Sequence, residues 1–296
     1  MLTERTYRMI RSRVPRALRT GAASGAEAVG VATSGLRVLP SFVIVGGQRC
    51  GTNSLYEYLV DHPAVGRAMP GQEVHFFDTS FDRGLDWYRA HFPTRLWMRA
   101  ARARTGVEPQ TGESSPYYMF HPLAPGRIAA TLPEVRIIVL LRNPVDRAIS
   151  HFHHERSRGH EPLERLSEAI AREPERLAGE AARIVAEPGY RSPAHQRFSY
   201  VARGQYADQL ATILELFEPG RVLVVVSERL FGEPEAVLAE VQEFLGLPVR
   251  LGGEYERHNA GSYRDIDATL RRSLAGRFSG SNERVAAMLG VDPPWD

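Results

Sequence analysis

Lysine is absent from this chain of 296 residues, because all 37 of its Lys and Arg residues are arginine. A protein without lysine cannot form a Schiff base, use a lysine as general base or carry the lysine-bearing phosphate loop of ATPases and GTPases. Codon bias in a GC-rich genome is the simplest cause. Whatever the cause, a site that commonly uses lysine must here use arginine or have no cation.

Cysteine, long apolar runs and net charge are also scarce. Cys50 is the single cysteine, which excludes an internal disulfide and a cysteine-rich zinc site and favours a reducing compartment, the cytoplasm. No apolar stretch approaches the ~20 residues that cross a bilayer, and we expect no signal peptide. The net charge of +2, without a dense basic run, argues against nucleic acid as a partner.

The rest of the composition is ordinary for a globular protein, with 43% hydrophobic and 24% charged residues. Residues 20–35 are rich in small residues and lack large apolar anchors, so residues 1–38 are predicted to form a loosely ordered N-terminal arm. Residues 39–296 are predicted to form a single domain. Within it, residues 155–200 are rich in Glu, Arg and Pro and are expected to form a helical insertion.

Three short apolar runs, at 41–45, 135–141 and 221–226, have the pattern of buried parallel strands. Helical periodicity is found at 55–60, 163–186, 206–217, 235–245 and 280–290. Strands that alternate with helices predict an α/β fold of three layers, in which helices flank a mainly parallel sheet. Ligands bind such sheets at the carboxyl ends of the strands, so the residues after each run are the candidate site.

The first strand is followed by Gly46-Gly-Gln-Arg-Cys-Gly-Thr-Asn-Ser54 and then by a helix. A glycine-bearing turn at the start of a helix points several backbone N–H groups at one place, where the helix dipole favours an anion. Thr52, Asn53 and Ser54 add hydrogen-bond donors. This segment therefore predicts a phosphate cradle.

The cradle differs from that of an ATPase. When the Walker pattern is laid on this loop, Thr52 stands at the lysine position and Asn53 at the magnesium-ligand position, which argues against Mg-dependent phosphoryl transfer. We therefore expect no metal. A cysteine phosphatase would need an arginine six residues after Cys50, but that position holds Tyr56, so Cys50 is interpreted as a small packed residue.

The loop resembles the 5′-phosphosulfate loop of sulfotransferases that use 3′-phosphoadenosine-5′-phosphosulfate (PAPS), with the approximate pattern G-x-x-K/R-x-G-T-T/S. The resemblance implies a P-loop-like fold and binding of PAPS, and of its product PAP, by Gln48, Arg49, Cys50, Gly51, Thr52, Asn53 and Ser54. Many members carry a lysine where this chain has Arg49. The role of that lysine at the 5′-phosphate comes to Arg49 by position and charge only.

A second match follows the strand at 135–141. Arg142-Asn-Pro-Val-Asp-Arg-Ala-Ile-Ser150 resembles the 3′-phosphate motif of the same family. Pro144 suits the first turn of a helix, and a planar guanidinium at Arg142 could share one phosphate with Ser150. The alternative is a structural ion pair of Arg142 at a helix start. Later positions that the resemblance assigns to the nucleotide are Arg203, Gly204, Tyr206, Ser262 and Tyr263.

The segment Glu73-Val-His-Phe-Phe-Asp78 is similar to the carbohydrate branch of the family, the heparan-sulfate sulfotransferases. The glutamate is the catalytic base there, which puts that role on Glu73. A carboxylate whose pKa is raised by desolvation can accept the proton that an alcohol loses as it attacks sulfur. His75, on the same face of an extended segment, could orient the acceptor or be the base itself. Asp78 and Glu113 are further candidate acceptor ligands, with a structural ion pair equally open for Glu113.

These matches predict a soluble, bacterial-type sulfotransferase that moves a sulfuryl group in line from PAPS to a hydroxyl (or amine) of a small-molecule or glycan acceptor. Two alternatives remain open. One is a P-loop nucleotide kinase, and the other is a nucleotide-binding module without catalysis. Neither the acceptor nor the oligomeric state can be predicted from the sequence.

Overall fold

The computed structural model describes residues 25, 27–69, 71–253, 255 and 267–295. A parallel five-stranded sheet lies at its centre, with the strand order β2-β3-β1-β4-β5. The strands are β1 (Phe42–Gly46), β2 (Val65–Gly66), β3 (Gln110–Ser114), β4 (Arg136–Leu141) and β5 (Val222–Val226). The three apolar runs of the sequence are thereby confirmed as β1, β4 and β5.

The helices surround this sheet. They are α3 (Thr52–Val60), α4 (Phe76–Thr79), α5 (Leu85–Arg89), α6 (Arg95–Thr105), α7 (Tyr117–Phe120), α8 (Ala124–Thr131), α9 (Pro144–Ser157), α10 (Leu166–Leu177), α11 (Glu180–Ala186), α12 (Pro193–Arg197), α13 (Tyr206–Leu216), α14 (Ser227–Gly232), α15 (Pro234–Phe244) and α16 (Ala268–Leu289). Short 3₁₀ turns are η1 (Ser34–Leu36), η2 (Phe81–Arg83), η3 (Ala202–Gly204) and η4 (Pro219–Arg221). Within the described ranges, no helix combines the length and the apolar character that a membrane span requires.

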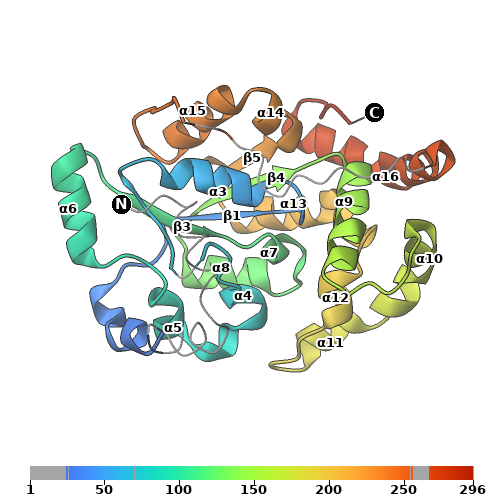
Figure 1. Cartoon of the computed structure of the whole chain (residues 1–296), viewed down its shortest axis with the longest axis horizontal. Helices are drawn as coiled ribbons and strands as arrows, with labels where there is room; N and C mark the ends of the chain where they lie inside the picture. Colours follow the sequence, from blue (N-terminus) through green and yellow to red (C-terminus); the bar gives the residue numbers. More distant parts are fainter. Residues whose placement is uncertain (1–24, 26, 70, 254, 256–266, 296) are drawn as a thin grey trace.

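Alternate side chains of β1 enter two separate cores. Phe42 and Ile44 pack with α3 and α15, whereas Val43 and Val45 pack with α8 and α13. Figure 1 shows the corresponding layers, with α3, α14 and α15 above the sheet and α4, α7 and α8 below it. Because β1 buries both of its faces, its sequence is a continuous apolar run. The predicted three-layer α/β fold is confirmed.

Strand β3 is the main element that the apolar pattern does not predict. Its sequence, Gln110-Thr-Gly-Glu-Ser114, is polar, yet all five residues are buried because β3 lies between β1 and β2. Gly112 is required there, since a Cβ atom at this position would collide with the carbonyl oxygen of Phe42. The strand thus places a polar sequence inside the protein, next to the carboxyl end of β1.

Two predicted helices have different bounds from those expected. The helical periodicity at 163–186 corresponds to two helices, α10 and α11, which are separated near Gly179, a residue in the left-handed conformation with a φ of 75°. The last helix, predicted at 280–290, is α16 and begins already at Ala268, where the Asp267 side chain accepts a hydrogen bond from the Thr269 amide. Asp267 therefore caps a helix of 22 residues.

The described end of the predicted arm, residues 27–38, is packed against the rest of the protein. Arg37 donates a hydrogen bond to the Phe92 carbonyl at 2.8 Å, and Ser34 is buried. Gly30 lies so close to Ala90 that an added Cβ would be 3.0 Å from the Ala90 Cβ. This part differs from the loose arm that was expected. The remainder of the predicted arm lies outside the described residues, and the single domain at 39–296 stays a prediction.

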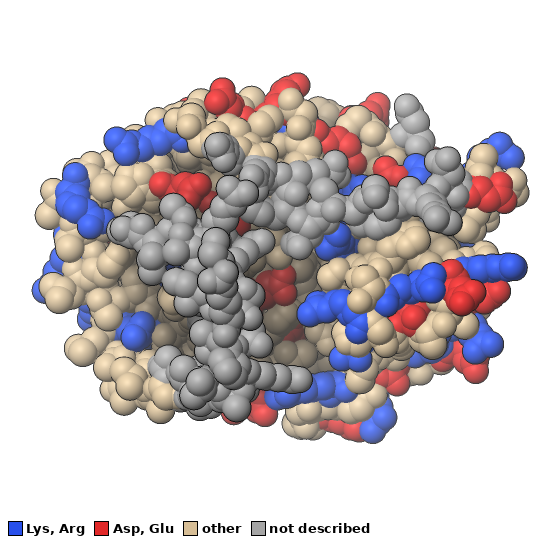
Figure 2. Space-filling view, in the orientation of Figure 1, with Lys and Arg blue, Asp and Glu red and all other residues tan. Residues whose placement is uncertain are grey.

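The predicted insertion at 155–200 contains α10, α11 and α12. A third apolar cluster joins this region to the sheet layers, with Phe152 from α9, Ile170 from α10 and Phe278 from α16. Arginine side chains, interspersed with acidic ones, gather over this part of the molecule at the right of Figure 2. The insertion therefore adds a charged wall beside the carboxyl ends of the strands.

Candidate active site

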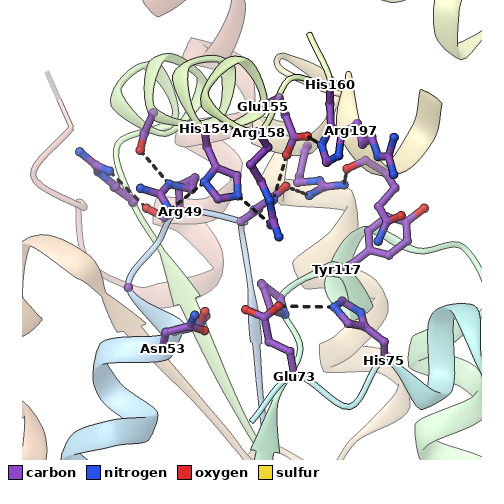
Figure 3. Close-up of a pocket in the computed structure, with 18 of the residues that line it drawn as sticks. Arg49, Asn53, Glu73, His75, Tyr117, His154, Glu155, Arg158, His160 and Arg197 are labelled. Carbon is purple, nitrogen blue, oxygen red and sulfur yellow. Dashed lines mark hydrogen bonds and ion pairs between the residues drawn. The ribbon is translucent and has the colours of Figure 1, made fainter. Parts of the chain in front are cut away.

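A cavity of about 850 Å³ opens where β1, β3 and β4 end. In the sheet, β1 lies between β3 and β4, so the strand order reverses at β1. Such a switch point leaves a crevice outside the carboxyl ends of the strands. The cavity is lined by Gln48, Arg49, Gly51, Thr52, Asn53, Glu73, His75, Pro116, Tyr117, Arg142, Ser150, His154, Glu155, Arg158, His160, Gln196, Arg197, Arg203 and Phe231. Figure 3 shows most of these side chains converging on one space.

The loop between β1 and α3 has the backbone geometry of an anion cradle. Gly46 has a φ of 137° and leaves no room for a Cβ, which would collide with the Leu140 carbonyl. Arg49 and Gly51 follow with φ values of 77° and 86°. Because Gly51 precedes α3 and has no side chain that could cap it, the first-turn amides of Thr52 and later residues are available to a ligand.

Arg49 connects the two loops that the sequence identifies separately. Its Nε donates to the Ser150 Oγ at 3.0 Å, and its Nη1 lies 3.5 Å from the Nδ1 of His154. Arg142 donates from Nη1 to the Arg49 carbonyl at 3.2 Å. Arg142 thus has a loop carbonyl as its partner, where the alternative interpretation expected an acidic side chain. The structure therefore brings Arg49, Arg142 and Ser150 into one wall of the cavity.

Three side chains that the sequence assigns to the nucleotide lie behind this wall. Cys50, Ser54 and Tyr206 are fully buried and do not line the cavity. Tyr206 donates instead to the Arg142 carbonyl at 3.0 Å, and its hydroxyl is 3.7 Å from the Cys50 sulfur. The structure differs from the prediction here: Tyr206 supports the loop from below, and Cys50 and Ser54 can reach a ligand only through their backbone.

The environment of the thiol agrees with its interpretation as a packed residue. Burial raises the pKa of Cys50 to about 11, although the charge of Arg147 opposes this. The thiol is therefore protonated at neutral pH and is a poor nucleophile. Gly204 is buried against Phe278 and does not line the cavity. Ser262 and Tyr263 lie outside the described residues.

Arg203 is a buried cation at the wall of the cavity. Its side chain donates to the Gln48 side chain and to the His195 and Gln196 carbonyls, and its guanidinium lies 4.9 Å from the centre of the Tyr117 ring. Desolvation lowers the pKa of Arg203 to about 10, so it remains charged at neutral pH. A desolvated guanidinium whose hydrogen-bond partners are neutral favours an anionic ligand.

The base segment is turned where an extended conformation was expected. His75 has a φ of 55°, in the left-handed region. The turn still brings the two candidate bases together, since the His75 Nε2 lies 3.5 Å from the Glu73 Oε2. On the other side, the His75 Nδ1 is 2.7 Å from the Asp78 Oδ2. Figure 3 shows Glu73 and His75 facing the same space.

Asp78 lies behind His75 and has a side chain with no exposed surface. It therefore orients the imidazole, and the structure differs from the prediction that it contacts the acceptor. Arg49 and His75 are the non-glycine residues with positive φ among those that the structure describes. Such a conformation costs on the order of 1–2 kcal/mol for each residue, and both of these residues belong to the cavity.

The protonation states separate the two candidate bases. Desolvation disfavours the charged form of His75, but hydrogen bonding and charge from Asp78 and Glu73 outweigh it and raise the pKa of His75 to about 10. Desolvation also acts on Glu73, but hydrogen bonds from His75 and Asn53 outweigh it, and the pKa of Glu73 is lowered from its ordinary value. The expectation of a raised pKa for Glu73 is therefore wrong, because its neighbours stabilise the carboxylate.

Glu113 also differs from both of its predicted roles. Its carboxylate is fully buried in β3 and accepts hydrogen bonds from the Tyr88 and Tyr118 hydroxyls and from Ser115. These partners are neutral, so Glu113 is not part of a structural ion pair. Nor does it line the cavity. The two phenylalanines of the base segment, Phe76 and Phe77, belong to the core.

Several residues that line the cavity were not predicted from the sequence, among them His154, Arg158, Gln196 and Arg197. Ser150, His154 and Arg158 follow one another at intervals of four along α9, a spacing that places them on one face. Because Ser150 was already a candidate, the same spacing of four residues could have identified His154 and Arg158. Gln196 and Arg197 come from α12 in the insertion, where no sequence pattern marks them. Figure 3 shows His154, Arg158 and His160 across the cavity from Glu73 and His75.

Comparison with known proteins decides the family. Residues 39–266 match the family model described as Sulfotransferase domain. The chain belongs to the sulfotransferase family. This confirms the family predicted from the two phosphate loops, and with it the P-loop-like fold.

Individual relatives of this sulfotransferase-family chain include two curated proteins. Heparan sulfate glucosamine 3-O-sulfotransferase 3B1 of Homo sapiens is 34% identical, over 89% of this chain and 66% of that protein. Heparan sulfate glucosamine 3-O-sulfotransferase 6 of Mus musculus is 35% identical, over 72% of this chain and 54% of that protein. The chain thus spans between about half and two thirds of the length of these relatives. The predicted similarity to the carbohydrate branch is confirmed.

A solved structure supports the same family assignment. The sulfotransferase from Alicyclobacillus acidocaldarius superposes with a TM-score of 0.66 and is 28% identical. The match covers 86% of this chain and 98% of that one. A bacterial sulfotransferase structure therefore shares most of the architecture described above.

Proposed function

We propose that this protein transfers a sulfuryl group from PAPS to a hydroxyl, or an amine, of a small-molecule or glycan acceptor. One observation carries the proposal. The phosphate cradle and the carboxylate of Glu73, whose lowered pKa keeps it ionised at neutral pH, line the same cavity at the carboxyl end of β1. A base that faces an anion cradle is the arrangement that transfer of an anionic group to an alcohol needs.

The residues of the cradle suit the donor. The backbone turn and Arg49 suit a 5′-phosphosulfate, and Arg142 with Ser150 suits a 3′-phosphate, because guanidinium forks bind phosphate oxygens in pairs. PAPS would supply the activated sulfuryl group when bound. A guanidinium supplies charge and hydrogen bonds but no transferable proton, so Arg49 would stabilise the charge that grows on the departing phosphate by these means alone. Electrostatic assistance of this kind does not require a proton donor.

Glu73 would accept the proton that the acceptor hydroxyl loses as its oxygen attacks sulfur. Its low pKa keeps it ionised and ready at neutral pH, whereas His75 already holds a proton. His75 would then donate a hydrogen bond or hold the acceptor oxygen, with Asp78 fixing the ring from behind at 2.7 Å. The opposite pKa shifts of the two residues support Glu73, rather than His75, as the base.

The variant Glu73→Gln tests this mechanism. It should keep its affinity for PAP, because the cradle is intact, and lose turnover by about 10²–10⁴-fold, the usual contribution of a general base. Glu240→Gln is a matched control, since Glu240 is a carboxylate of similar exposure that pairs Arg229 of α14 with α15 and does not line the cavity. Undiminished sulfuryl transfer by Glu73→Gln would remove Glu73 from the role of base.

The two alternatives make different predictions in binding experiments. Calorimetry with PAP against ATP, with and without Mg²⁺, separates a sulfotransferase from a nucleotide kinase. Formation of PAP from PAPS in the presence of acceptors separates an enzyme from a binding module. A panel of acceptors, scanned by mass spectrometry for the gain of one sulfuryl group, would identify the substrate.

Some aspects of the proposal rest on the sequence alone. That the reaction needs no metal follows from Thr52 and Asn53 at the Walker positions, and a cytoplasmic location follows from the single cysteine. The roles of Ser262 and Tyr263 at the 3′-phosphate rest on the resemblance. Each of these stays a prediction.

A further inference from the structure

Glu113 is a buried carboxylate that accepts hydrogen bonds from the base segment itself and from side chains packed against that segment. Its Oε1 accepts from the Tyr88 hydroxyl at 2.6 Å and from the Tyr118 hydroxyl at 3.0 Å. Its Oε2 accepts from the Ser115 hydroxyl at 2.6 Å and from the Val74 amide at 3.2 Å. Four donors thus converge on the two oxygens of this buried side chain.

Three consecutive amides of the base segment are held by this cluster. The Val74 amide donates directly to Glu113. The His75 amide donates to Ser115 at 3.2 Å, and the Phe76 amide donates to the Tyr118 hydroxyl at 2.7 Å. Both hydroxyls in turn donate hydrogen bonds to Glu113. One carboxylate therefore orients the donors and acceptors that fix residues 74–76.

This support matters because the segment has no regular secondary structure to hold it. Residues 73–75 lie outside any helix or strand, and His75 adopts a left-handed conformation that a histidine rarely takes. The amides of a chain in that conformation cannot join a sheet and would be buried without partners. The Phe76 ring is also stacked on Tyr88, with centroids 4.5 Å apart, so the same tyrosine fixes the far end of the turn.

We propose that Glu113 is a positioning residue for catalysis, whose buried carboxylate sets the turn at residues 74–76 and thereby aims Glu73 and His75 into the cavity. The inference rests on the proposed function insofar as Glu73 is taken as the base. It gives Glu113 a role in the reaction although the residue touches neither substrate.

The conservative substitution Glu113→Gln isolates this role. An amide of the same shape keeps one acceptor oxygen but presents an NH₂ group where the other carboxylate oxygen accepted hydrogen bonds. At least one hydroxyl or the Val74 amide then loses its partner, and the turn can relax. Displacement of a catalytic group by about 1 Å costs on the order of 100-fold, so we expect kcat to fall by about 10- to 100-fold.

The matched control is Glu161→Gln. Glu161 is another carboxylate without side-chain exposure, and it accepts from the Tyr200 hydroxyl and from Arg176, away from the base segment. We expect Glu113→Gln to bind PAP with wild-type affinity, within about twofold, while kcat falls. Glu161→Gln should keep wild-type kcat. Wild-type kcat in Glu113→Gln would overturn the proposal.

A second readout is independent of activity. Hydrogen exchange of the Val74, His75 and Phe76 amides should be at least about tenfold faster in folded Glu113→Gln than in the wild type. Unchanged exchange at all three amides would overturn the proposal even if kcat fell. If the wild type itself transfers no sulfuryl group from PAPS, the proposed function fails, but the exchange result still decides whether Glu113 holds the turn.

A milder variant covers the case in which Glu113→Gln does not fold. Ser115→Ala removes one hydroxyl of the cluster and the acceptor of the His75 amide. It should accelerate exchange at the His75 amide and lower kcat with PAP affinity unchanged. Wild-type exchange and wild-type kcat in this variant would overturn the proposal.

Discussion

Removing the charge of Glu73 or of Asp78 should lower the pKa of His75 by different amounts. The His75 ring lies between these carboxylates, 3.5 Å from Glu73 and 2.7 Å from Asp78, and they raise its pKa to about 10. Two unit charges about 4 Å apart interact by about 1 kcal/mol in water and about 4 kcal/mol at an effective dielectric constant of 20. The Glu73 side chain is 41% exposed, so solvent screening keeps its contribution near the lower figure, whereas the Asp78 side chain is fully buried.

These magnitudes predict the order of the variants. One pKa unit corresponds to about 1.4 kcal/mol, so Glu73→Gln should lower the pKa of His75 by about one unit, and Asp78→Asn by about three units. The linkage has a definite sign. Because the folded pKa is raised, the stabilisation by charged His75 is fully present below pH 6.5 and is lost as the pH rises toward about 10.

The assay is an NMR titration of the imidazole signals, assigned with His75→Gln, in the wild type and both variants. Glu240→Gln serves again as the control and should leave the titration unchanged. In the wild type, the pH profile of kcat/KM should show no rise near pH 6.5 that follows deprotonation of His75. A wild-type His75 that titrates near pH 6.5, or equal effects of the two carboxylates, would refute the reasoning and reopen His75 as the base.

Further predictions concern the phosphate loop and Glu113. Arg49→Ala should lower kcat by about 10²–10³-fold, as expected for loss of a preorganised donor, whereas Arg49→Lys should cause only a modest loss; equal losses in steady-state assays would contradict a purely electrostatic role. Gly46→Ala should lower the melting temperature and weaken PAP binding, because its Cβ would collide with the Leu140 carbonyl; unchanged melting and calorimetry would show that the loop can yield. Burial raises the pKa of Glu113 to about 7, so the stability that it contributes should be present below about pH 4.5 and lost as the pH rises to about 7. Denaturant titrations of Glu113→Gln should lack this part of the pH dependence, and an identical dependence in both proteins would exclude Glu113 as its source.

Apolar runs predicted those parts of the fold that are buried on both faces by apolar side chains. β1 and β4 are of this kind, and the partly buried edge strand β5 has the same apolar composition. β3 could not be predicted in the same way, because its residues are polar. They are buried together with their hydrogen-bond partners, and Glu113 with its tyrosine and serine partners is the main example. A strand that carries part of the site's support lacks the composition by which buried strands are usually identified.

The cavity could be predicted where one continuous segment forms it. The loop after β1 and the start of α9 could be identified as phosphate-binding segments from the local spacing of their residues. The structure brings Arg49, Arg142 and Ser150 of these segments together. The base segment was found, but its turn and protonation were not, because both depend on groups brought from elsewhere in the chain. Arg197 of α12 reaches the cavity through tertiary packing alone, and no local sequence pattern indicates it.

Because Cys50 is buried, its rate of reaction with a thiol reagent reports opening of the phosphate loop. The thiol lies beneath the phosphate loop without exposed surface, and the Ser227 hydroxyl donates to its carbonyl. A thiol reagent can reach it only when the loop separates from Tyr206 and β5, and the chain offers that reagent no second cysteine. The rate of alkylation therefore measures how often the cradle opens, and ligands that close the cradle should slow it without any label being introduced.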